Sequence, residues 1–297
     1  MNLQELNKQY AKPGKIEFIK GNGELTIAKL TSKHATAEVC LYGAHVLSFK
    51  PNNQDDLLWL SEKSFWEPGK PIRGGIPVCF PYFGPHASDS NKPPHGFARL
   101  INWSVLETTV NANDECVLQL GLEANAETKA IWPFQFKAQI TVVVGTQLNL
   151  SLSYTNTGNE PFTCSDALHT YFNIGSINDI KIKGLEGVRF YNGFEKEPTH
   201  VQTEKELLIV QEENRRYIDH SADCIIEDPI LKRNIKVSKK NSSVTVVWNP
   251  WINCKNVADF TENSYQSFVC VEAVNAYDNS VSLLPGQSHT FSAIIRC

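Results

Sequence analysis

The sequence has neither a long apolar run nor a leader-like N-terminus. No stretch approaches the roughly 18 consecutive apolar residues that a transmembrane helix needs. The opening segment, MNLQELNKQYAKPGK, carries no apolar core and no cleavage signal of a secretory leader. We therefore expect a soluble, cytoplasmic protein that does not engage a membrane.

Clustered positive charge and paired cysteines are also missing. No run of Lys or Arg stands out, the formal net charge is −4 and the pI is about 6.1. Neither nucleic acid nor a charged membrane surface is therefore an expected partner. None of the eight cysteines belongs to a C-x-x-C pair, and several, such as Cys79 and Cys270, stand between apolar residues. We expect reduced, buried thiols.

Motifs for cofactors, metals and covalent nucleophiles are absent as well. The chain contains no G-x-G-x-x-G, no P-loop and no G-x-S-x-G, so nothing supports nucleotide binding or a serine nucleophile. The eight histidines are dispersed, with His86 and His95 nine residues apart. We therefore expect no metal site and no cofactor.

Period-two alternation, in contrast, dominates the chain. Leu148, Leu150 and Leu152 share one face of a predicted strand, and Gly145-Thr146 before it suits a two-residue hairpin. Other predicted strands cover residues 117–122, 136–142, 24–28, 36–41, 45–49, 180–183, 244–248, 268–274 and 289–295. Helical turns are predicted only at 2–10 and 61–65. We predict an all-β fold, a single large antiparallel β-sandwich with few short helices, as one domain over residues 1–297.

Two candidate binding segments lie in and beside an irregular region at 66–97, which is dense in Pro, Gly and aromatic residues. A loop that long is usually functional. Arg73 precedes Gly74-Gly75, where the backbone could approach a ligand closely and the guanidinium could fork onto its oxygens. His95 and Arg99 stand four residues apart in HGFAR. Taken alone, both segments are equally compatible with surface turns.

Two candidate proton-transfer groups stand in apolar surroundings. His169 lies in ALHTYF, where burial among aromatic side chains could hold an imidazole proton available near neutral pH. Glu272 lies in CVEAVN, where alternation places it on one face with Cys270 and Val274. A carboxylate in an apolar strand has to be paired or titrate abnormally. A core histidine and a solvent-facing glutamate remain open alternatives.

Eight segments, in order along almost the whole chain, resemble the aldose 1-epimerase superfamily. They are GAHVLSF (43–49), LLWLSEKS (57–64), RGGIPVCFPYFGP (73–85), HGFAR (95–99), ALHTYF (167–172), VWNPW (247–251), CVEAVN (270–275) and LLPGQS (283–288). RGG-x-P and HGFAR favour its hexose-6-phosphate mutarotase branch. The resemblance implies a β-sandwich of the galactose-mutarotase type that needs no cofactor, and a monomer is the default expectation.

The resemblance also implies roles for individual residues. His169 would be the general acid and Glu272 the general base, and Arg73, His95 and Arg99 would bind substrate. The family's D-R-x-Y segment, whose acid contacts sugar, finds its nearest match at Asn214-Arg215-Arg216-Tyr217, in a segment that reads as a loop. Asn214 stands in the place of the acid, with Glu213 beside it, so a sugar contact there stays open.

The implied reaction interconverts the α and β anomers of a hexose 6-phosphate. One base removes the proton of the C1 hydroxyl, one acid protonates the ring oxygen, and the roles reverse on closure. Arg73 and Arg99 are the candidates for phosphate. Aromatic side chains available for stacking on the sugar are Trp66, Phe80, Tyr82, Phe83 and Trp251. The alternatives are an epimerase for unphosphorylated hexoses and a non-catalytic sugar-phosphate-binding module. A glycoside hydrolase would want a second buried acid.

Overall fold

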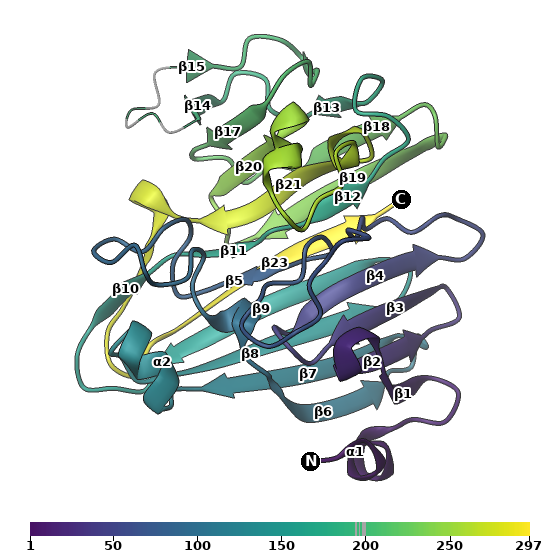
Figure 1. Cartoon of the computed structure of the whole chain (residues 1–297), viewed down its shortest axis with the longest axis vertical. Coiled ribbons are helices and arrows are strands. Elements are labelled where there is room, and N and C mark those ends of the chain that lie inside the picture. The colour runs from purple at the N-terminus through teal and green to yellow at the C-terminus, as the bar shows by residue number, and fades with distance from the viewer. Residues whose placement is uncertain (194, 196, 198–199) are drawn as a thin grey trace.

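The computed structural model describes residues 1–193, 195, 197 and 200–297. Antiparallel sheets dominate it, which confirms the predicted all-β class (Figure 1). Its α-helices are α1 (Leu3–Tyr10) and α2 (Ala126–Ile131). Short 3₁₀ turns are η1 (Asn22–Glu24), η2 (Ala98–Leu100), η3 (Trp251–Asn256), η4 (Ser264–Gln266) and η5 (Tyr277–Asn279). No helix among the described residues combines the length and the apolar character that a bilayer crossing requires.

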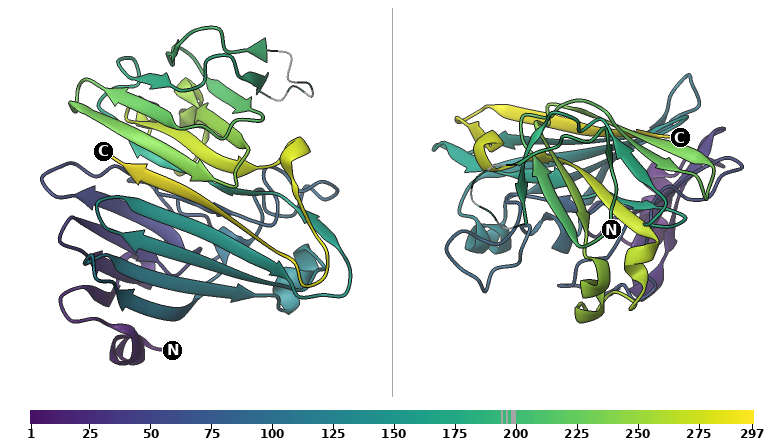
Figure 2. Two further views of the ribbon diagram at one scale, coloured as in Figure 1. Left: turned by 180° about the vertical axis from the view of Figure 1, so that it is seen from behind. Right: turned by 90° about the horizontal axis from the view of Figure 1, so that it is seen from above.

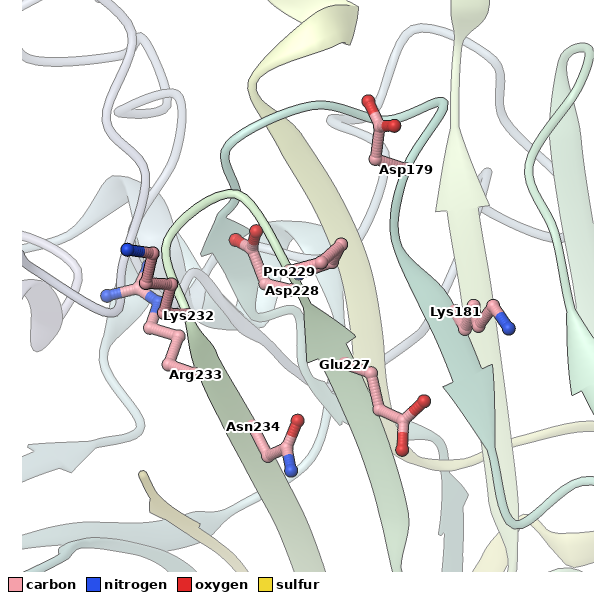
Figure 3. Close-up of a pocket in the computed structure, with 8 residues that line it drawn as sticks. All are labelled: Asp179, Lys181, Glu227, Asp228, Pro229, Lys232, Arg233 and Asn234. Carbon is pink, nitrogen blue, oxygen red and sulfur yellow. The ribbon is translucent and has the colours of Figure 1, made fainter.

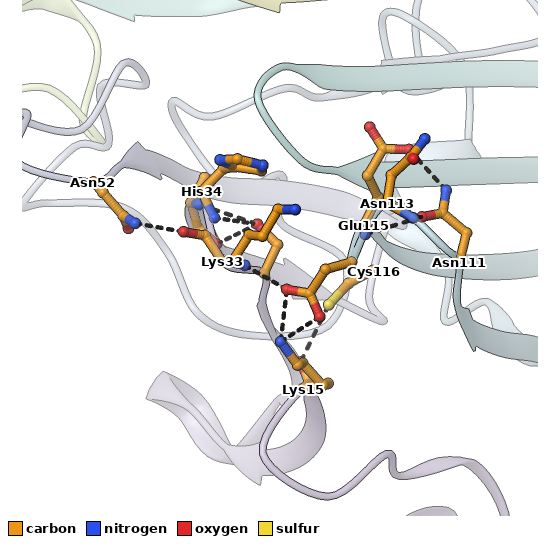
Figure 4. A network of polar contacts seen from close by, with 11 residues as sticks. Lys15, Lys33, His34, Asn52, Asn111, Asn113, Glu115 and Cys116 are labelled. Atoms are coloured by element: carbon orange, nitrogen blue, oxygen red, sulfur yellow. Dashed lines mark hydrogen bonds and ion pairs between the residues drawn. The ribbon is translucent and has the colours of Figure 1, made fainter.

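The first sheet is an antiparallel meander near the N-terminus. It runs in chain order through β1 (Ile16–Lys20), β2 (Thr26–Thr31), β3 (Ala35–Cys40) and β4 (His45–Pro51). Helix α1 begins at a capping box, in which the Asn2 side chain and Glu5 satisfy each other's backbone N–H groups. Asp114, in the turn before β7, accepts hydrogen bonds from Lys15 Nζ and Lys33 N, both at 2.7 Å (Figure 4).

The longest sheet has nine strands. Their order is β16 (Glu206–Leu207), β13 (Lys181–Lys183), β18 (Cys224–Asp228), β19 (Arg233–Lys240), β23 (Ser288–Arg296), β9 (Leu148–Asn156), β8 (Phe136–Val144), β7 (Cys116–Glu123) and β6 (Ser104–Val110). Seen from behind, it spans the length of the molecule (Figure 2). Strand β9 alternates buried and half-buried residues along its whole length, as the sequence predicts.

The third sheet carries the functional candidates. Its path is β15 (His200–Val201), β14 (Arg189–Asn192), β17 (Glu213–Tyr217), β20 (Val244–Asn249), β21 (Phe268–Asn275), β11 (Asp166–Leu168) and β5 (Val78–Cys79), with β12 (Tyr171–Asn173) also paired to β21. A two-stranded ribbon, β10 (Phe162–Cys164) with β22 (Val281–Leu283), completes the strands of the described residues.

The main hydrophobic core draws residues from all three large sheets, for example Phe49 of β4, Leu152 of β9 and Val271 of β21. The sheets are therefore packed face to face, as in a sandwich. The cysteines are all free; seven are buried, as predicted, and Cys297 is exposed.

Candidate active site

A cavity of about 510 Å³ opens on the third sheet and has the size of a small-molecule site. It is lined by Arg73, Phe83, Gly84, Pro85, Pro94, His95, His169, Gly193, Asn214, Arg216, Val246, Trp248, Glu272 and Tyr277. Strands β17, β20 and β21 contribute five of the lining residues, and the irregular region 66–97 contributes six. The fold thus brings four of the five predicted site residues together, and the long loop serves this cavity.

Glu272 reaches the cavity because β21 is buried on both faces. Val269, Val271 and Ala273 point into the main core, whereas Cys270 and Val274 belong to two smaller apolar clusters on the other face. Glu272 shares that second face and is only 2% exposed. Its Oε2 has no hydrogen-bond partner among the described residues. The carboxyl group is therefore held in apolar surroundings with one oxygen available to a ligand.

His169 lies beside Glu272, in the short link between β11 and β12. Its backbone N–H donates to the Pro77 carbonyl at 3.1 Å, and its ring stacks on Tyr171 with centroids 4.8 Å apart. The ring nitrogen Nε2 lies 3.3 Å from Oε1 of Glu272. Because β11 and β12 both pair with β21, the strand register fixes the two side chains against each other.

Burial changes the proton affinity of both groups. It lowers the pKa of His169 well below 6.5, an effect strengthened by His95, Arg99 and Arg73. Burial also raises the pKa of Glu272 well above 4.5. Burial thus disfavours the charged form of each group, and the two groups, 3.3 Å apart, titrate as a pair.

His95 also lines the cavity, as a neutral hydrogen-bond donor. Burial, with Arg99 and Arg73, lowers its pKa to about 3. Its Nδ1 accepts a hydrogen bond from the Gly84 N–H at 3.2 Å, so the ring proton resides on Nε2. Its ring lies 5.9 Å from that of His169. His95 can thus donate to a substrate oxygen close to the proton-transfer pair.

Arg73 lines the cavity beside His169 and is anchored by two partners. Its Nε donates to Asp259 Oδ2 at 3.1 Å and its Nη1 to the Tyr171 hydroxyl at 3.0 Å. Burial opposes its charged form, but Tyr171 and Asp259 together raise the pKa of its guanidinium. The chain's own packing already requires a glycine after Arg73, because a Cβ on Gly74 would lie 2.4 Å from the Trp59 carbonyl oxygen.

Arg99 does not line the cavity; it lies behind its wall. Its Nη2 donates to the carbonyl of Pro94, a lining residue, at 2.9 Å, and its Nε has no partner among the described residues. The side chain is almost fully enclosed, and burial lowers the pKa of its guanidinium. Arg99 therefore acts on the cavity through its electric field, which contributes to the lowered pKa of His95.

The segment around Asn214 is a strand and not the predicted loop. Strand β17 pairs with β14 and β20, and its residues Asn214 and Arg216 both line the cavity. Glu213 points away, and its Oε1 accepts a hydrogen bond from Arg215 Nε at 3.0 Å. Asn214 and Arg216 are two residues apart, so alternation along a strand places both on the same face. This alternation is the sequence signal that could have identified Arg216 as a lining residue.

Of the five aromatic residues suggested for sugar stacking, Phe83 alone lines the cavity. Phe80 lies in the main core, Trp66 and Trp251 pack against apolar clusters, and the Tyr82 hydroxyl donates to the Pro93 carbonyl. Two further aromatic residues, Trp248 and Tyr277, line the cavity and were not among the predicted ones.

His169, Glu272 and Cys270 also bring possible metal-ligand atoms within 4.8 Å of one another. Burial raises the pKa of the Cys270 thiol well above its ordinary value. Arg73 and Arg99 also make the surroundings positive, which disfavours a cation at this cluster. The same His–Glu arrangement suits direct proton transfer.

A second hollow, of about 530 Å³, contains none of the predicted site residues. It is lined by Asp179, Lys181, Glu227, Asp228, Pro229, Lys232, Arg233 and Asn234 (Figure 3). Asp228 accepts hydrogen bonds from three backbone N–H groups, and Arg233 donates to three backbone carbonyls. These two charged side chains thus join neighbouring chain segments.

Known proteins of similar sequence point to the same chemistry. The aldose 1-epimerase family profile matches residues 26–296. A protein of Escherichia coli K12 is 34% identical over 254 residues, covering 85% of this chain and 84% of its own. One from Cenchrus ciliaris is 33% identical over 265 residues, covering 86% and 79%. Both bear the provisional name glucose-6-phosphate 1-epimerase.

Solved structures agree on the fold. A provisionally named mutarotase from Salmonella typhimurium matches with a TM-score of 0.89 and 28% identity, covering 97% of this chain and 95% of that one. A galactose mutarotase-like protein from Clostridium acetobutylicum shares the fold at 15% identity, with a TM-score of 0.73 and coverage of 94% and 97%. The chain belongs to the aldose 1-epimerase family.

Proposed function

We propose that this protein is a mutarotase that interconverts the α and β anomers of glucose 6-phosphate and related hexose 6-phosphates. The observation that carries the proposal is the buried pair of His169 Nε2 and Glu272 Oε1, 3.3 Å apart on the wall of a sugar-sized cavity. Relatives named for glucose-6-phosphate epimerisation support this substrate.

Ring opening requires a base at the C1 hydroxyl and an acid at the ring oxygen. In the proposed mechanism Glu272 accepts the hydroxyl proton while His169 donates to the ring oxygen. The C1–C2 bond of the open aldehyde then rotates, and closure on the other face of the carbonyl reverses both transfers. Each group recovers its original proton state, so the cycle needs no other reactant.

The remaining lining residues position the sugar and favour an anionic one. His95 Nε2–H and the unused N–H groups of Arg73 can donate to sugar oxygens next to the reacting pair. Arg99 adds positive charge from behind the wall.

The pH dependence of turnover tests the shared proton. A second proton on the pair removes the base, and loss of the last proton removes the acid. A histidine acid with an ordinary pKa would lose its proton, and turnover would fall, as the pH rises through 6.5. Because burial lowers the pKa of His169 and raises that of Glu272, the two groups should titrate as a pair. We expect kcat, after subtraction of the spontaneous rate, to show no midpoint at 6.5. A loss of turnover on raising the pH with a midpoint at 6.5 would indicate an ordinary, solvated histidine.

Polarimetry of freshly dissolved α-glucose 6-phosphate tests the function itself. The protein should accelerate the approach to anomeric equilibrium, and more strongly for glucose 6-phosphate than for glucose. Equal acceleration of both sugars would favour an epimerase for unphosphorylated hexoses. Saturable binding without any acceleration would favour a non-catalytic sugar-phosphate-binding module.

A further inference from the structure

A third hollow, of about 810 Å³, shares no lining residue with the candidate active site. Its lining residues come mainly from the end of β4, from the loop that follows it and from the β18–β19 hairpin. It adjoins the second hollow, because Lys232, Arg233 and Asn234 line both. The volume lies in the range of small-molecule sites.

Positive side chains outnumber acidic ones in this third hollow. Three of its lining residues are cations, namely Lys50, Lys232 and Arg233, and the acidic one is Asp55. The ion pairs in the described part of the chain include none of these four residues. Lys232 and Arg233 extend to the same side of the hairpin (Figure 3). Like charges that line one hollow repel each other and attract an anion.

The Arg233 guanidinium is held in place without being neutralised. Its Nη1 donates to the Asp55 carbonyl at 3.0 Å, and its Nη2 donates to the carbonyls of Asp56 and Asn173 at 3.2 and 2.6 Å. Carbonyl groups orient a guanidinium but leave its charge unpaired. Nη1 keeps a second N–H that these bonds do not use. The cation is therefore oriented before any ligand arrives.

The acid nearest to Arg233 in the hairpin is engaged elsewhere. Strand register places Asp228 opposite Arg233. The Asp228 carboxylate accepts hydrogen bonds from the backbone N–H groups of Gly175, Ile230 and Leu231 at 2.9, 3.1 and 3.0 Å. Asp228 lines the second hollow and not the third. The third hollow thus keeps its excess of positive charge.

The charges and the neutral groups of the third hollow indicate the class of ligand. Three cations and one acid give its side chains a net charge of +2, which a dianion balances. A phosphate monoester carries a charge of about −1.5 to −2 near pH 7. Guanidinium, ammonium and amide N–H groups all donate to phosphate oxygens, and the amides of Asn53, Gln54 and Asn234 also line the hollow.

We propose that the third hollow is a second ligand site, which binds a small phosphorylated molecule through Lys50, Lys232 and Arg233. The site lies outside the cavity that contains His169 and Glu272. It is therefore independent of the proposed function, and it would exist even in a protein without catalytic activity.

NMR titration of the ¹⁵N-labelled full-length protein with inorganic pyrophosphate tests this proposal at about 0.15 M ionic strength. The backbone amide signals of residues 53–55 and 232–234 should shift in a saturable way. Lys50→Gln combined with Lys232→Gln should weaken the affinity at these signals by at least about tenfold, because two charge-assisted contacts are lost. Both lysines are exposed, so this double variant should keep the wild-type melting temperature.

The matched control is Lys129→Gln combined with Lys240→Gln. It removes the same number of positive charges at exposed lysines that do not line the third hollow, and it should leave the affinity within about twofold of wild type, since distant exposed charges are screened. Shifts confined to the candidate active site, or equal affinities of the two double variants at residues 53–55 and 232–234, would overturn the proposal.

Discussion

Glu272→Gln should lower kcat for anomerisation of glucose 6-phosphate by about 10²–10⁴-fold, the usual contribution of a positioned general base. The amide has the size of the carboxyl group but cannot take the proton of the C1 hydroxyl. Because Glu272 is almost fully buried and its Oε2 lacks a partner, the neutral side chain should leave the melting temperature unchanged or raise it. Polarimetry and thermal unfolding of the same preparation measure both effects.

Glu213→Gln is the matched control for this substitution. Glu213 is 3% exposed and its carboxylate pairs with Arg215, but it does not line the cavity. Its replacement should lower the melting temperature, because Arg215 loses its charged partner, and should leave kcat near the wild-type value. Near-normal turnover in Glu272→Gln would show that another group is the base.

His169→Ala should reduce kcat by a factor of the same order, because the ring oxygen loses its acid. The double variant with Glu272→Gln should be little slower than either single variant, since the two groups share one proton and act as a unit. Polarimetric rates of the wild type, the two single variants and the double variant give this coupling directly. A loss of kcat in the double variant equal to the product of the two single losses would argue against a shared proton.

The control for His169 is His220→Ala. His220 is also buried, and its ring contacts Thr245 and the Gly184 carbonyl outside the cavity. Removing this ring should destabilise the fold and leave the kcat of the folded protein unchanged. A comparable loss of kcat in His220→Ala would mean that general destabilisation, and not loss of the acid, explains the result for His169→Ala.

The sequence predicted the strands that alternate cleanly and missed those rich in charge. Strands β8, β9, β20, β21 and β23 lie where period-two alternation indicates. Strand β17 reads ENRRY, in which polar residues occupy both faces and hide the alternation. Asn214 and Arg216 face the cavity, whereas Glu213 and Arg215 form an ion pair with each other. The turn between β8 and β9 has three residues, 145–147, one more than predicted.

The predicted helical turn at 61–65 is a single hydrogen-bonded turn, in which Ser64 N donates to the Ser61 carbonyl at 3.2 Å, and it does not continue as a helix. The Ser61 hydroxyl accepts from Lys63 N and donates to the Asp259 carbonyl at 2.6 Å, and the Ser64 hydroxyl accepts from Arg73 N at 2.8 Å. Both serines thus connect the turn to distant backbone around Arg73. Contacts over 198 residues of separation are beyond the reach of any local pattern.

The candidate site could likewise be predicted from the sequence only in part. Residue type and apolar context suggested His169 and Glu272 individually, but only the pairing of β11 and β12 with β21 places them 3.3 Å apart. The burial of Arg99 behind Pro94 has no signature in HGFAR. The orientation of Arg216 depends on two tyrosines, Tyr191 and Tyr277, that stack on its guanidinium and are distant from it in the sequence.

Two-dimensional exchange NMR of glucose 6-phosphate at anomeric equilibrium tests the central claim most directly, since it observes each anomer while nothing is consumed. Wild-type protein should produce exchange cross-peaks between the α and β C1 protons at mixing times too short for the spontaneous reaction, and Glu272→Gln should abolish them. Absence of exchange with the folded wild-type protein, or undiminished exchange with Glu272→Gln, would contradict the account.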